Sequence, residues 1–427
     1  MDTGQLLNME FAEKARRTEG YLQQNMPHYL ALLHEMVSIN SFTANMGGVN
    51  KHGSQVAAIF AELGFVAEEV QSVEPLYGRH LILTRRGQES DGRPAPTIGL
   101  VSHLDTVFPP DEEERNDFHW REQGERIYGP GIVDIKGGTI MIYMIMAAFH
   151  AIHPREFETT TWVILLDSSE ETGGWDFGRL CVDRLGEGAL GCLIFEPGSW
   201  SGEDAHVVVS RKGMAIYRVE VEGKAAHAGS SHAQGANAVL QMADVIDRIC
   251  GMTDYDRNLT FNVGTVAGGT VINRVPHFAS ASVEMRAFDE AIFDEGVANV
   301  LALNDLSTVR SHDGAFACRV TTKVMTTVTP WPRNPQTGRL FEIWRETAQL
   351  LGYGAVGEAR AGLSDGNYFW NELPTIDGLG PAGGNAHCSE RADDGSKDQE
   401  YVLPATFVPK ALLNTMAILN LLEQDHE

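Results

Sequence analysis

Residues 161–174, TWVILLDSSEETGG, decide the fold class of this chain. The apolar run at 163–166 is short and continuous, which is typical of a strand buried on both faces of a sheet. Glu170 and Glu171 follow it, at the end where open α/β sheets bind ligands. Adjacent carboxylates at such a place are costly unless they are paired, protonated or bound to metal. The pair therefore indicates either a solvated acidic turn or part of a functional site.

The length and composition indicate a globular protein of two domains. At 427 residues the chain exceeds the usual size of one compact core. Its hydrophobic content of 43% is ordinary for a folded protein. The 58 acidic and 33 basic side chains give a formal net charge of −25, which argues against a basic surface for nucleic acid or anionic membranes.

The cysteines and the N-terminal segment bear on the compartment. The five cysteines are scattered and none has the Cys-x-x-Cys spacing, so neither a disulfide framework nor a structural zinc knuckle is expected. Residues 1–30 contain no apolar core of signal-peptide length. The most apolar run, residues 140–149, is shorter than the about 20 residues that span a bilayer. We expect a soluble, cytoplasmic protein without a membrane or nucleic-acid partner.

The pattern of apolar residues changes inside the chain. Residues 208–322 mix alternating strands with amphipathic helices, which predicts an inserted α+β domain. Residues 1–207 and 323–427 carry short buried strands and apolar helices, and we predict that they form one discontinuous α/β domain. Its central sheet would have helices on both faces, because its strands are apolar throughout.

Other side chains that can bind metal also lie at the ends of predicted elements. His103 follows the strand at 97–101, with Asp105 two residues later, and Glu196 follows the apolar run at 190–195. Asp134 precedes a buried apolar helix. Taken singly, His103 is also explained as an incidental strand-end histidine and Asp134 as a helix cap.

Together these residues have the composition of a hydrolytic metal site. Imidazole nitrogens and carboxylate oxygens are the ligand types of such zinc sites. Two metals held by so few residues need one carboxylate as a bridge and leave one free as a base. The set is His103, Asp134, Glu170, Glu171, Glu196 and a late histidine, His387.

Motifs along the chain, in this order, resemble the M20 family of zinc metallopeptidases: SHLDTV, GPGIVDIKGG, DSSEETGG, FEPGSW, KAAHAG and GPAGGNAHCSE. The resemblance extends from residue 38 to the C-terminus. FEPGSW and KAAHAG are most similar to the glutamate carboxypeptidase (carboxypeptidase G2-like) branch. The resemblance to the family implies a di-zinc catalytic domain that is interrupted by a smaller dimerisation or lid domain. It therefore also implies a homodimer.

The resemblance implies two Zn²⁺ ions per subunit that share one aspartate, with Co²⁺ or Mn²⁺ as other metals that such sites accept. The ligands would be His103, Asp134 and Glu196 for one ion and Asp134, Glu171 and His387 for the other. Glu170 would be the general base, and Asp105 would hold His103. The family also often has a cis peptide bond after the bridging aspartate, here Asp134–Ile135.

The resemblance also implies substrate contacts. His227, in a turn of the inserted domain, would stabilise the oxyanion in the partner subunit's active site; the alternative is a turn histidine near a dimer contact. Arg286 and Asn273 match positions that bind the substrate's carboxylate and carbonyl, and a guanidinium suits a carboxylate because it offers two parallel donors. Gly362 and Ser364 would line the same pocket.

Some features depart from the family pattern. Residues 324–332 contain no basic residue that could bind a glutamate side chain. The insert at 391–399, RADDGSKDQ, is long and charged, and we expect it to reshape the rim of the pocket. Cys388, beside a predicted ligand, is interpreted as a packing residue.

These observations predict a metal-dependent amide hydrolase that releases a C-terminal amino acid from an N-acyl amino acid or short peptide. The alternatives are a deacylase of N-acyl amino acids or a dipeptidase with the same site. A non-catalytic metal-binding relative is a further alternative, against which the presence of Glu170 and of all the inferred ligands argues.

Overall fold

The computed structural model describes residues 3–89 and 92–426, and the chain divides into two compact units. Unit 1 consists of Met1–Val209, Arg333–Ala359 and Ser364–Glu427, and unit 2 of Ser210–Pro332 and Arg360–Leu363. The predicted boundary at 322/323 falls inside strand β13 (Arg319–Val328), which pairs with β10 (Gly213–Glu222) in unit 2. Strand pairing therefore carries unit 2 beyond the residue at which the sequence pattern changes.

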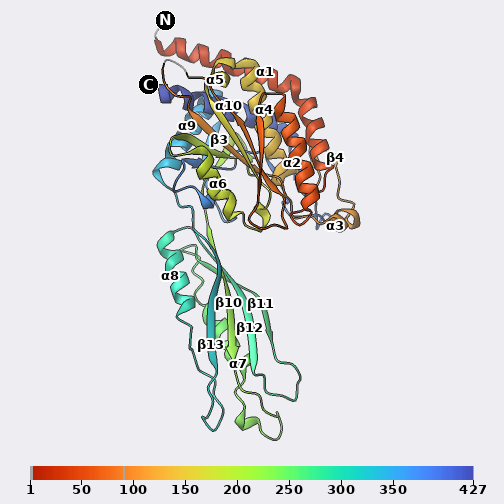
Figure 1. The fold of residues 1–427 in the computed structure, drawn as a ribbon, viewed down its shortest axis with the longest axis vertical. Coiled ribbons are helices and arrows are strands. Elements are labelled where there is room, and N and C mark those ends of the chain that lie inside the picture. Colours follow the sequence, from red (N-terminus) through yellow and green to blue (C-terminus); the bar gives the residue numbers. More distant parts are fainter. Residues whose placement is uncertain (1–2, 90–91, 427) are drawn as a thin grey trace. The chain divides into compact units, whose positions relative to one another are not determined.

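The main sheet of unit 1 has the strand order β1-β2-β6-β3-β7-β15. Its strands are β1 (Val66–Gln71), β2 (Arg79–Arg85), β6 (Thr161–Asp167), β3 (Thr97–His103), β7 (Ala189–Ile194) and β15 (Thr375–Ile376). Strands β6, β3, β7 and β15 are parallel, whereas β2 and β1 are added antiparallel. The predicted α/β class is confirmed (Figure 1).

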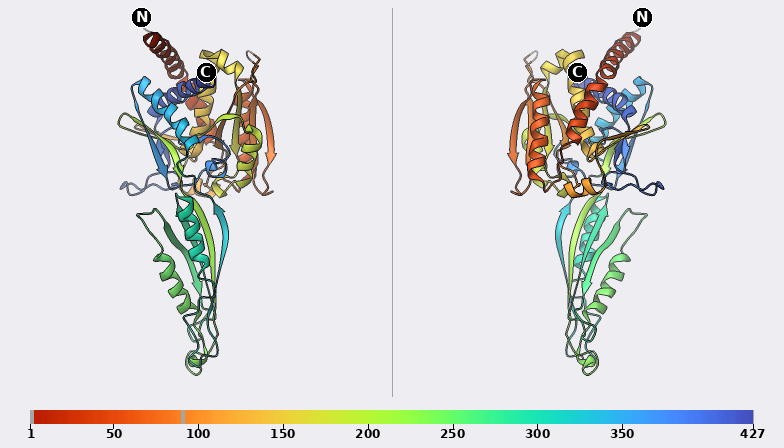
Figure 2. Two further views of the ribbon diagram at one scale, coloured as in Figure 1. Left: turned by 90° about the vertical axis from the view of Figure 1, so that its left-hand side faces the viewer. Right: turned by 90° about the vertical axis from the view of Figure 1, so that its right-hand side faces the viewer.

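Helices cover both faces of this sheet. Strands β3 and β6 are buried at every position but the first, which requires cover on both sides. Strand β3 contacts α4 (Gly137–Ile152) and α6 (Trp175–Leu185). Helix α4 also packs against α1 (Thr3–Val37) and α10 (Phe407–His426), and α10 packs against α9 (Pro335–Leu351). The N-terminal part of α1 projects beyond the rest of unit 1 (Figure 2).

Two helical segments of the described chain, Ile132–Ile152 and Pro404–Asp425, are long and apolar enough to cross a membrane by length and composition. The apolar run at 140–149 is part of the first of these segments, because the helical chain continues on both sides of it. In the structure 94% and 72% of their most apolar windows are buried inside the protein. Both segments thus serve as core helices of unit 1.

Parallel strands place their carboxyl ends at the same edge of the sheet. Strand β3 ends at His103 and β6 at Asp167, and these two residues are register partners. Strand β7 ends two residues before Glu196. The helix of one turn that follows β6, η2 (Glu170–Thr172), begins with the paired glutamates. The fold therefore gathers the side chains that the sequence places after separate strands.

Smaller elements frame this edge. A second sheet of unit 1 has the order β16-β17-β5-β4, with the bounds β16 (Gly383–Gly384), β17 (Tyr401–Val402), β5 (Arg126–Tyr128) and β4 (Arg121–Gln123). A third consists of β14 (Gly354–Arg360), β9 (Asp204–Arg211) and β8 (Ser199–Ser201). The remaining helices near the edge are α2 (Met46–Ala61), α3 (Pro110–Arg115), η1 (Ile132–Lys136) and η4 (Asp365–Tyr368).

Unit 2 is an antiparallel sheet covered by two helices. The strand order is β11 (Thr260–Gly268), β12 (Phe278–Ala287), β10 and β13. Alternate residues of β10 are buried, and this face packs in one core with α7 (Ala238–Cys250) and α8 (Glu290–Leu301). The alternation read from the sequence matches this half-buried sheet.

The carboxyl end of β6 is braced by a buried imidazole. His80 is 1% exposed, and its Nδ1 and Nε2 lie 3.0 Å from Asp167 Oδ1 and 3.1 Å from Asp176 Oδ2. Burial alone would lower the pKa of His80, but hydrogen bonds to the two carboxylates outweigh it and raise the pKa to about 9. The imidazolium therefore links β2, β6 and α6 in the folded state.

The raised pKa predicts a pH-dependent contribution of His80 to stability. Because the folded pKa of about 9 exceeds the ordinary value of 6.5, the contribution is complete below pH 6.5 and is lost as the pH rises through 9. A pKa shift of this size corresponds to a contribution of roughly 3 kcal/mol to the free energy of unfolding. We expect His80→Gln to destabilise the protein by about this amount at pH 6 and by much less at pH 10, measured by urea unfolding. His119→Gln, which alters an exposed histidine beside Asp117, is the control. An equal loss at both pH values for His80→Gln would contradict the assignment.

Candidate active site

Asp134 lies between two histidines. Its Oδ1 is 3.1 Å from His103 Nε2, and its Oδ2 is 3.3 Å from His387 Nε2. The aspartate belongs to η1, immediately before the buried helix α4, and the peptide bond Asp134–Ile135 is cis, as the family resemblance implied. The two oxygens of one carboxylate thus face two separate imidazoles, which is the arrangement that a bridging ligand requires.

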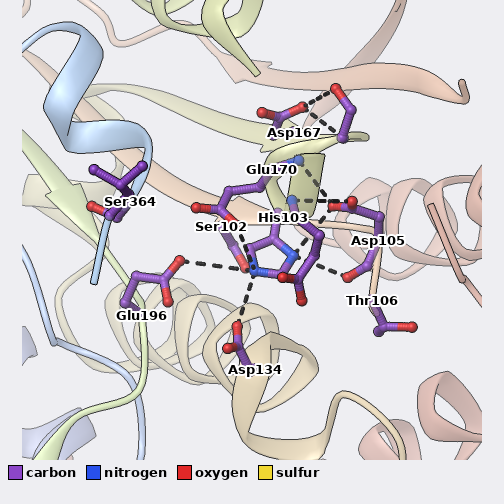
Figure 3. Close-up of polar contacts among 12 residues, drawn as sticks. Ser102, His103, Asp105, Thr106, Asp134, Asp167, Glu170, Glu196 and Ser364 are labelled. Atoms are coloured by element: carbon purple, nitrogen blue, oxygen red, sulfur yellow. Dashed lines mark hydrogen bonds and ion pairs between the residues drawn. The ribbon is translucent and has the colours of Figure 1, made fainter. Parts of the chain in front are cut away.

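A glutamate accompanies each imidazole. Glu196 Oε1 lies 3.8 Å from His103 Nε2, and Glu171 Oε2 lies 3.1 Å from His387 Nε2. Figure 3 shows Glu196 and Asp134 pointing toward His103. The structure therefore brings the predicted ligands together as two sets, each with one histidine, one glutamate and a share of Asp134.

The spacing of the donor atoms fits metal ions. Tetrahedral zinc with bonds of 2.0–2.1 Å holds neighbouring ligand atoms about 3.3 Å apart. The distances from each histidine nitrogen to the carboxylate oxygens of its set are 3.1–3.8 Å. Donor atoms of His103, Asp134 and Glu171 all lie within 4.8 Å of one another. Glu171 Oε1 is buried and has no hydrogen-bond partner within the described part of the chain. The residues present therefore suit a pair of divalent cations.

Asp105 orients both sides of the site. His103 Nδ1 is 3.0 Å from the Asp105 backbone oxygen and 3.4 Å from its Oδ1. The same carboxylate accepts hydrogen bonds from the backbone N–H groups of Glu170 and Glu171, at 3.2 and 3.3 Å, and from the hydroxyl of Thr43 at 2.7 Å. Asp105 thus fixes the histidine ring and also the backbone of the glutamate pair.

Glu170 stands beside the donor sets. Its Oε2 lies 4.0 Å from His103 Nε2, and its side chain is 16% exposed. Burial raises the pKa of Glu170 well above its usual range, and repulsion from the Glu196, Glu171 and Asp134 carboxylates adds to the effect. The neighbouring negative charges thus favour the protonated form of this carboxyl as long as no cation offsets them.

The imidazoles offset part of this negative charge. Burial would raise the pKa of Asp134, but hydrogen bonds from His103 and His387 outweigh it and hold the pKa below its usual range. In return, hydrogen bonds to Asp134 and Glu171 raise the pKa of His387 to about 11. Bound cations would take the place of the imidazolium protons, because metal ligands must be deprotonated.

Two buried acids near the site carry no signal in the sequence. Glu400 Oε1 accepts hydrogen bonds from the backbone N–H groups of Val133 and Asp134, at 2.9 and 3.1 Å, and burial raises the pKa of Glu400 to about 8. The pKa of Asp365, at the start of η4, is raised by burial and by the Asp167 and Glu170 carboxylates. Glu400 lies in a loop and Asp365 in a helix of one turn, and neither segment has an apolar period, so sequence reasoning missed them.

Gly362 and Ser364 lie on either side of the position in the sequence at which unit 2 ends and unit 1 resumes. Ser364 is buried in unit 1, where its hydroxyl donates to Asp377 Oδ2 at 2.9 Å and caps η4. Gly362 lies in unit 2, where its carbonyl oxygen accepts a hydrogen bond from Arg211 Nη1 at 3.0 Å. The hydroxyl of Ser364 is therefore engaged by another side chain of unit 1.

His227 and Asn273 meet in unit 2. His227 forms a β-bridge with Arg274, and the Asn273 carbonyl accepts the N–H of Ala228. His227 is exposed, and its Nδ1 accepts the backbone N–H groups of Gly229 and Ser230, both at 3.1 Å. Because Nδ1 acts as an acceptor, the proton of the neutral ring resides on Nε2.

Arg286 lies at the opposite end of the same sheet. It is the register partner of Met214 at the start of β10, whereas His227 follows the end of that strand. The 10 residues of β10 separate the two positions by roughly 30 Å. Glu284 holds two of the guanidinium nitrogens of Arg286, and Nη1 is buried without a hydrogen-bond partner among the described residues. One copy of unit 2 therefore does not bring Arg286 and His227 together.

The segment after His387 packs against two other elements. Arg391 Nη2 lies 2.8 Å from Asp117 Oδ2, just after α3, and Asp398 Oδ2 lies 2.7 Å from Arg126 Nη1 in β5. Cys388 is exposed, so its interpretation as a packing residue is wrong.

The chain is similar to curated carboxypeptidases and deacetylases. The chain is 28% identical over 268 residues to carboxypeptidase G2 of Pseudomonas sp. (strain RS-16), a match that covers 63% of this chain and 62% of the relative. A probable carboxypeptidase of Ajellomyces dermatitidis is 34% identical over 48% of each chain. The matches thus cover 62% and 48% of the length of these two relatives. Acetylornithine deacetylase of Edwardsiella ictaluri is 25% identical, over 62% of this chain and 69% of that enzyme.

Solved structures share the fold. Aminopeptidase PepT from Bacillus cereus superposes with a TM-score of 0.72 at 19% identity, covering 93% of this chain and 99% of that one. The Bacillus subtilis YXEP protein, a dinuclear metal binding peptidase from the M20 family, gives a TM-score of 0.63 at 14% identity, covering 93% and 99%. Residues 99–397, more than half of the sequence, match the model of Peptidase family M20/M25/M40, and the chain belongs to this family.

Proposed function

We propose that this protein is a metal-dependent carboxypeptidase of the glutamate carboxypeptidase type, which hydrolyses an amide bond and releases an amino acid with a free α-carboxylate. The observation that carries the proposal is the placement of Asp134, with one oxygen on His103 and the other on His387. The similarity to carboxypeptidase G2 supports the choice of reaction.

The site would hold two Zn²⁺ ions, with Co²⁺ or Mn²⁺ as other metals that such ligands accept. One ion would be bound by His103, Asp134 and Glu196, and the other by Asp134, Glu171 and His387. Such ions lower the pKa of a water molecule and polarise the scissile carbonyl.

Glu170 would act as the general base. Its carboxylate stands beside the donor sets, and its backbone is held by Asp105. It would take a proton from the attacking water and deliver it to the leaving amine, which is the task of a positioned carboxylate that binds no metal. Asp105 would keep His103 in the tautomer that presents Nε2 to the site.

Several residues outside the donor sets would contact the substrate. Arg286 would bind the α-carboxylate, since its buried Nη1 offers a donor without a protein partner among the described residues. Asn273 would contact the scissile carbonyl, and Gly362 and Ser364 would line the pocket. His227 would donate a hydrogen bond from its Nε2–H to the oxyanion. We propose that it serves the active site of a second copy, in a homodimer formed through unit 2.

The relative that deacetylates acetylornithine favours a second candidate, an N-acyl-amino-acid deacylase. A dipeptidase would use the same donor sets. The absence of a basic residue at 324–332 is consistent with these alternatives, because a glutamate side chain would lack a cation there.

The substrate class is tested by amino-acid release from a panel of N-acyl amino acids and dipeptides, with and without a chelator. The panel varies the C-terminal residue (Glu, Asp, Phe, Leu, Arg) against several acyl groups. We expect chelator-sensitive release that depends on the C-terminal residue and favours acidic ones. Release governed by the acyl group would favour the deacylase, and no release from a protein with two bound metals would reject both.

Removal of the general base should separate catalysis from metal binding. We expect Glu170→Gln to lower kcat by at least about 100-fold, because proton transfer by a positioned side chain contributes roughly 10²- to 10⁴-fold. The metal content should stay near two per subunit. Glu171→Ala, which removes a neighbouring carboxylate of the donor set, should lose metal as well as activity. Substantial turnover by Glu170→Gln would show that another group is the base.

The role of His227 predicts complementation between inactive chains. Homodimers of His227→Ala or of Glu170→Gln should be nearly inactive. Mixed dimers should regain activity, because one active site then contains both an intact Glu170 and an intact His227 from the partner. The fraction of mixed dimers is measured with two affinity tags, and confirmed mixed dimers without recovered activity would exclude a role of His227 across the interface.

A further inference from the structure

Glu400 joins two parts of the donor sets that are remote in sequence. It is fully buried, and its side chain binds the backbone N–H groups of Val133 and Asp134. Its own backbone N–H donates to the carbonyl oxygen of Cys388 at 2.8 Å, next to His387. The side chain thus holds the segment of the shared aspartate, while the main chain holds the segment of the histidine.

The two histidines are supported very differently. The His103 side chain is 1% exposed and is fixed by strand β3 and by Asp105. The His387 side chain is 52% exposed, and Asn385 and His387 both have a positive φ, at 58° and 66°. Packing therefore fixes His103, whereas the position of His387 depends on the backbone around it.

The segment 388–400 supplies that backbone support. This segment is a loop that begins at Cys388 and ends at Glu400. The hydrogen bond between the backbone groups of these two residues closes the loop. Buried Gln399 donates to the backbone oxygens of Asn116 and Ser389, at 3.0 and 2.9 Å. Strand β17 begins directly after Glu400 and pairs with β5 and β16. The return point of the loop is therefore rigid, and Glu400 is its contact with Asp134.

We propose that Glu400 is a positioning residue that sets the placement of Asp134 relative to His387, and thereby the affinity for the metal ion of the Asp134–Glu171–His387 set. The proposal rests on the proposed metal site. The other ion would depend on Glu400 less, because His103 is fixed by β3 and by Asp105, and Glu196 follows the end of β7. We therefore expect that removal of the Glu400 side chain lowers the affinity for one metal ion much more than the affinity for the other.

The test is a metal titration of the metal-free protein with Zn²⁺ against a chromophoric chelator, together with the absorption spectrum of the Co²⁺-loaded protein. We expect Glu400→Ala to weaken one of the two binding steps by roughly 10- to 100-fold, the usual cost of removing a residue that supports metal ligands. The spectrum of the second Co²⁺ should change. Glu400→Gln should remain within about threefold of the wild type, because its amide oxygen can still accept both N–H groups.

Asp398→Ala is the matched control. It lies two residues away and removes the contact with Arg126, but it leaves the bond between Glu400 and Asp134 intact, so both binding steps should be unchanged. If Glu400→Ala does not fold, as judged by circular dichroism of the metal-free protein, Glu400→Asp withdraws the carboxylate by one methylene and should weaken the same step.

The proposal is overturned if Glu400→Ala, or Glu400→Asp in its place, binds both ions like the wild type. It is also overturned if Glu400→Gln loses as much affinity as Glu400→Ala. Glu171→Ala distinguishes a failure of the proposed metal site from a failure of the proposed role of Glu400. If it keeps both ions, the proposed metal site is wrong. If it loses one ion while the Glu400 variants lose none, only the role of Glu400 fails.

Discussion

The carboxylates of Asp134, Glu170, Glu171 and Glu196 meet near the edge at which β3, β6 and β7 end, and their mutual repulsion must be offset. Burial and this repulsion raise the pKa of Glu170 and of Glu171. Imidazoles offset part of the charge, but carboxylates outnumber histidines in the cluster. Two divalent cations would offset it more completely, and this requirement connects the fold to the proposed chemistry.

Rigid supports hold the charged groups in place. Asp105 fixes His103 and the backbone of the glutamate pair, and His80 braces the end of β6 from behind. Glu400 performs the corresponding task for Asp134. Each support is buried and holds either a backbone segment or a histidine ring. The supports therefore limit the movement of the side chains that carry the donor atoms.

The parts of the site that could be predicted from the sequence are those that follow strands. His103, Glu170 and Glu196 come after apolar runs, and parallel pairing brings the ends of such runs together. The position of Glu400 could not be predicted, because it depends on a loop that closes through one hydrogen bond between backbone groups. The separation of Arg286 from His227 depends on the register of β10 with β12, which a single sequence does not contain. Unit 2 extends beyond the predicted boundary at 322/323 for a similar reason, since β13 pairs with β10 from Arg319 to Val328.

The central claim is that Asp134 bridges two metal ions. Anomalous diffraction at the zinc absorption edge from crystals of the zinc-loaded protein tests it most directly. The account predicts two peaks per subunit on either side of the Asp134 carboxylate, one beside His103 and Glu196 and one beside His387 and Glu171. A single peak, or peaks that do not share Asp134, would contradict it.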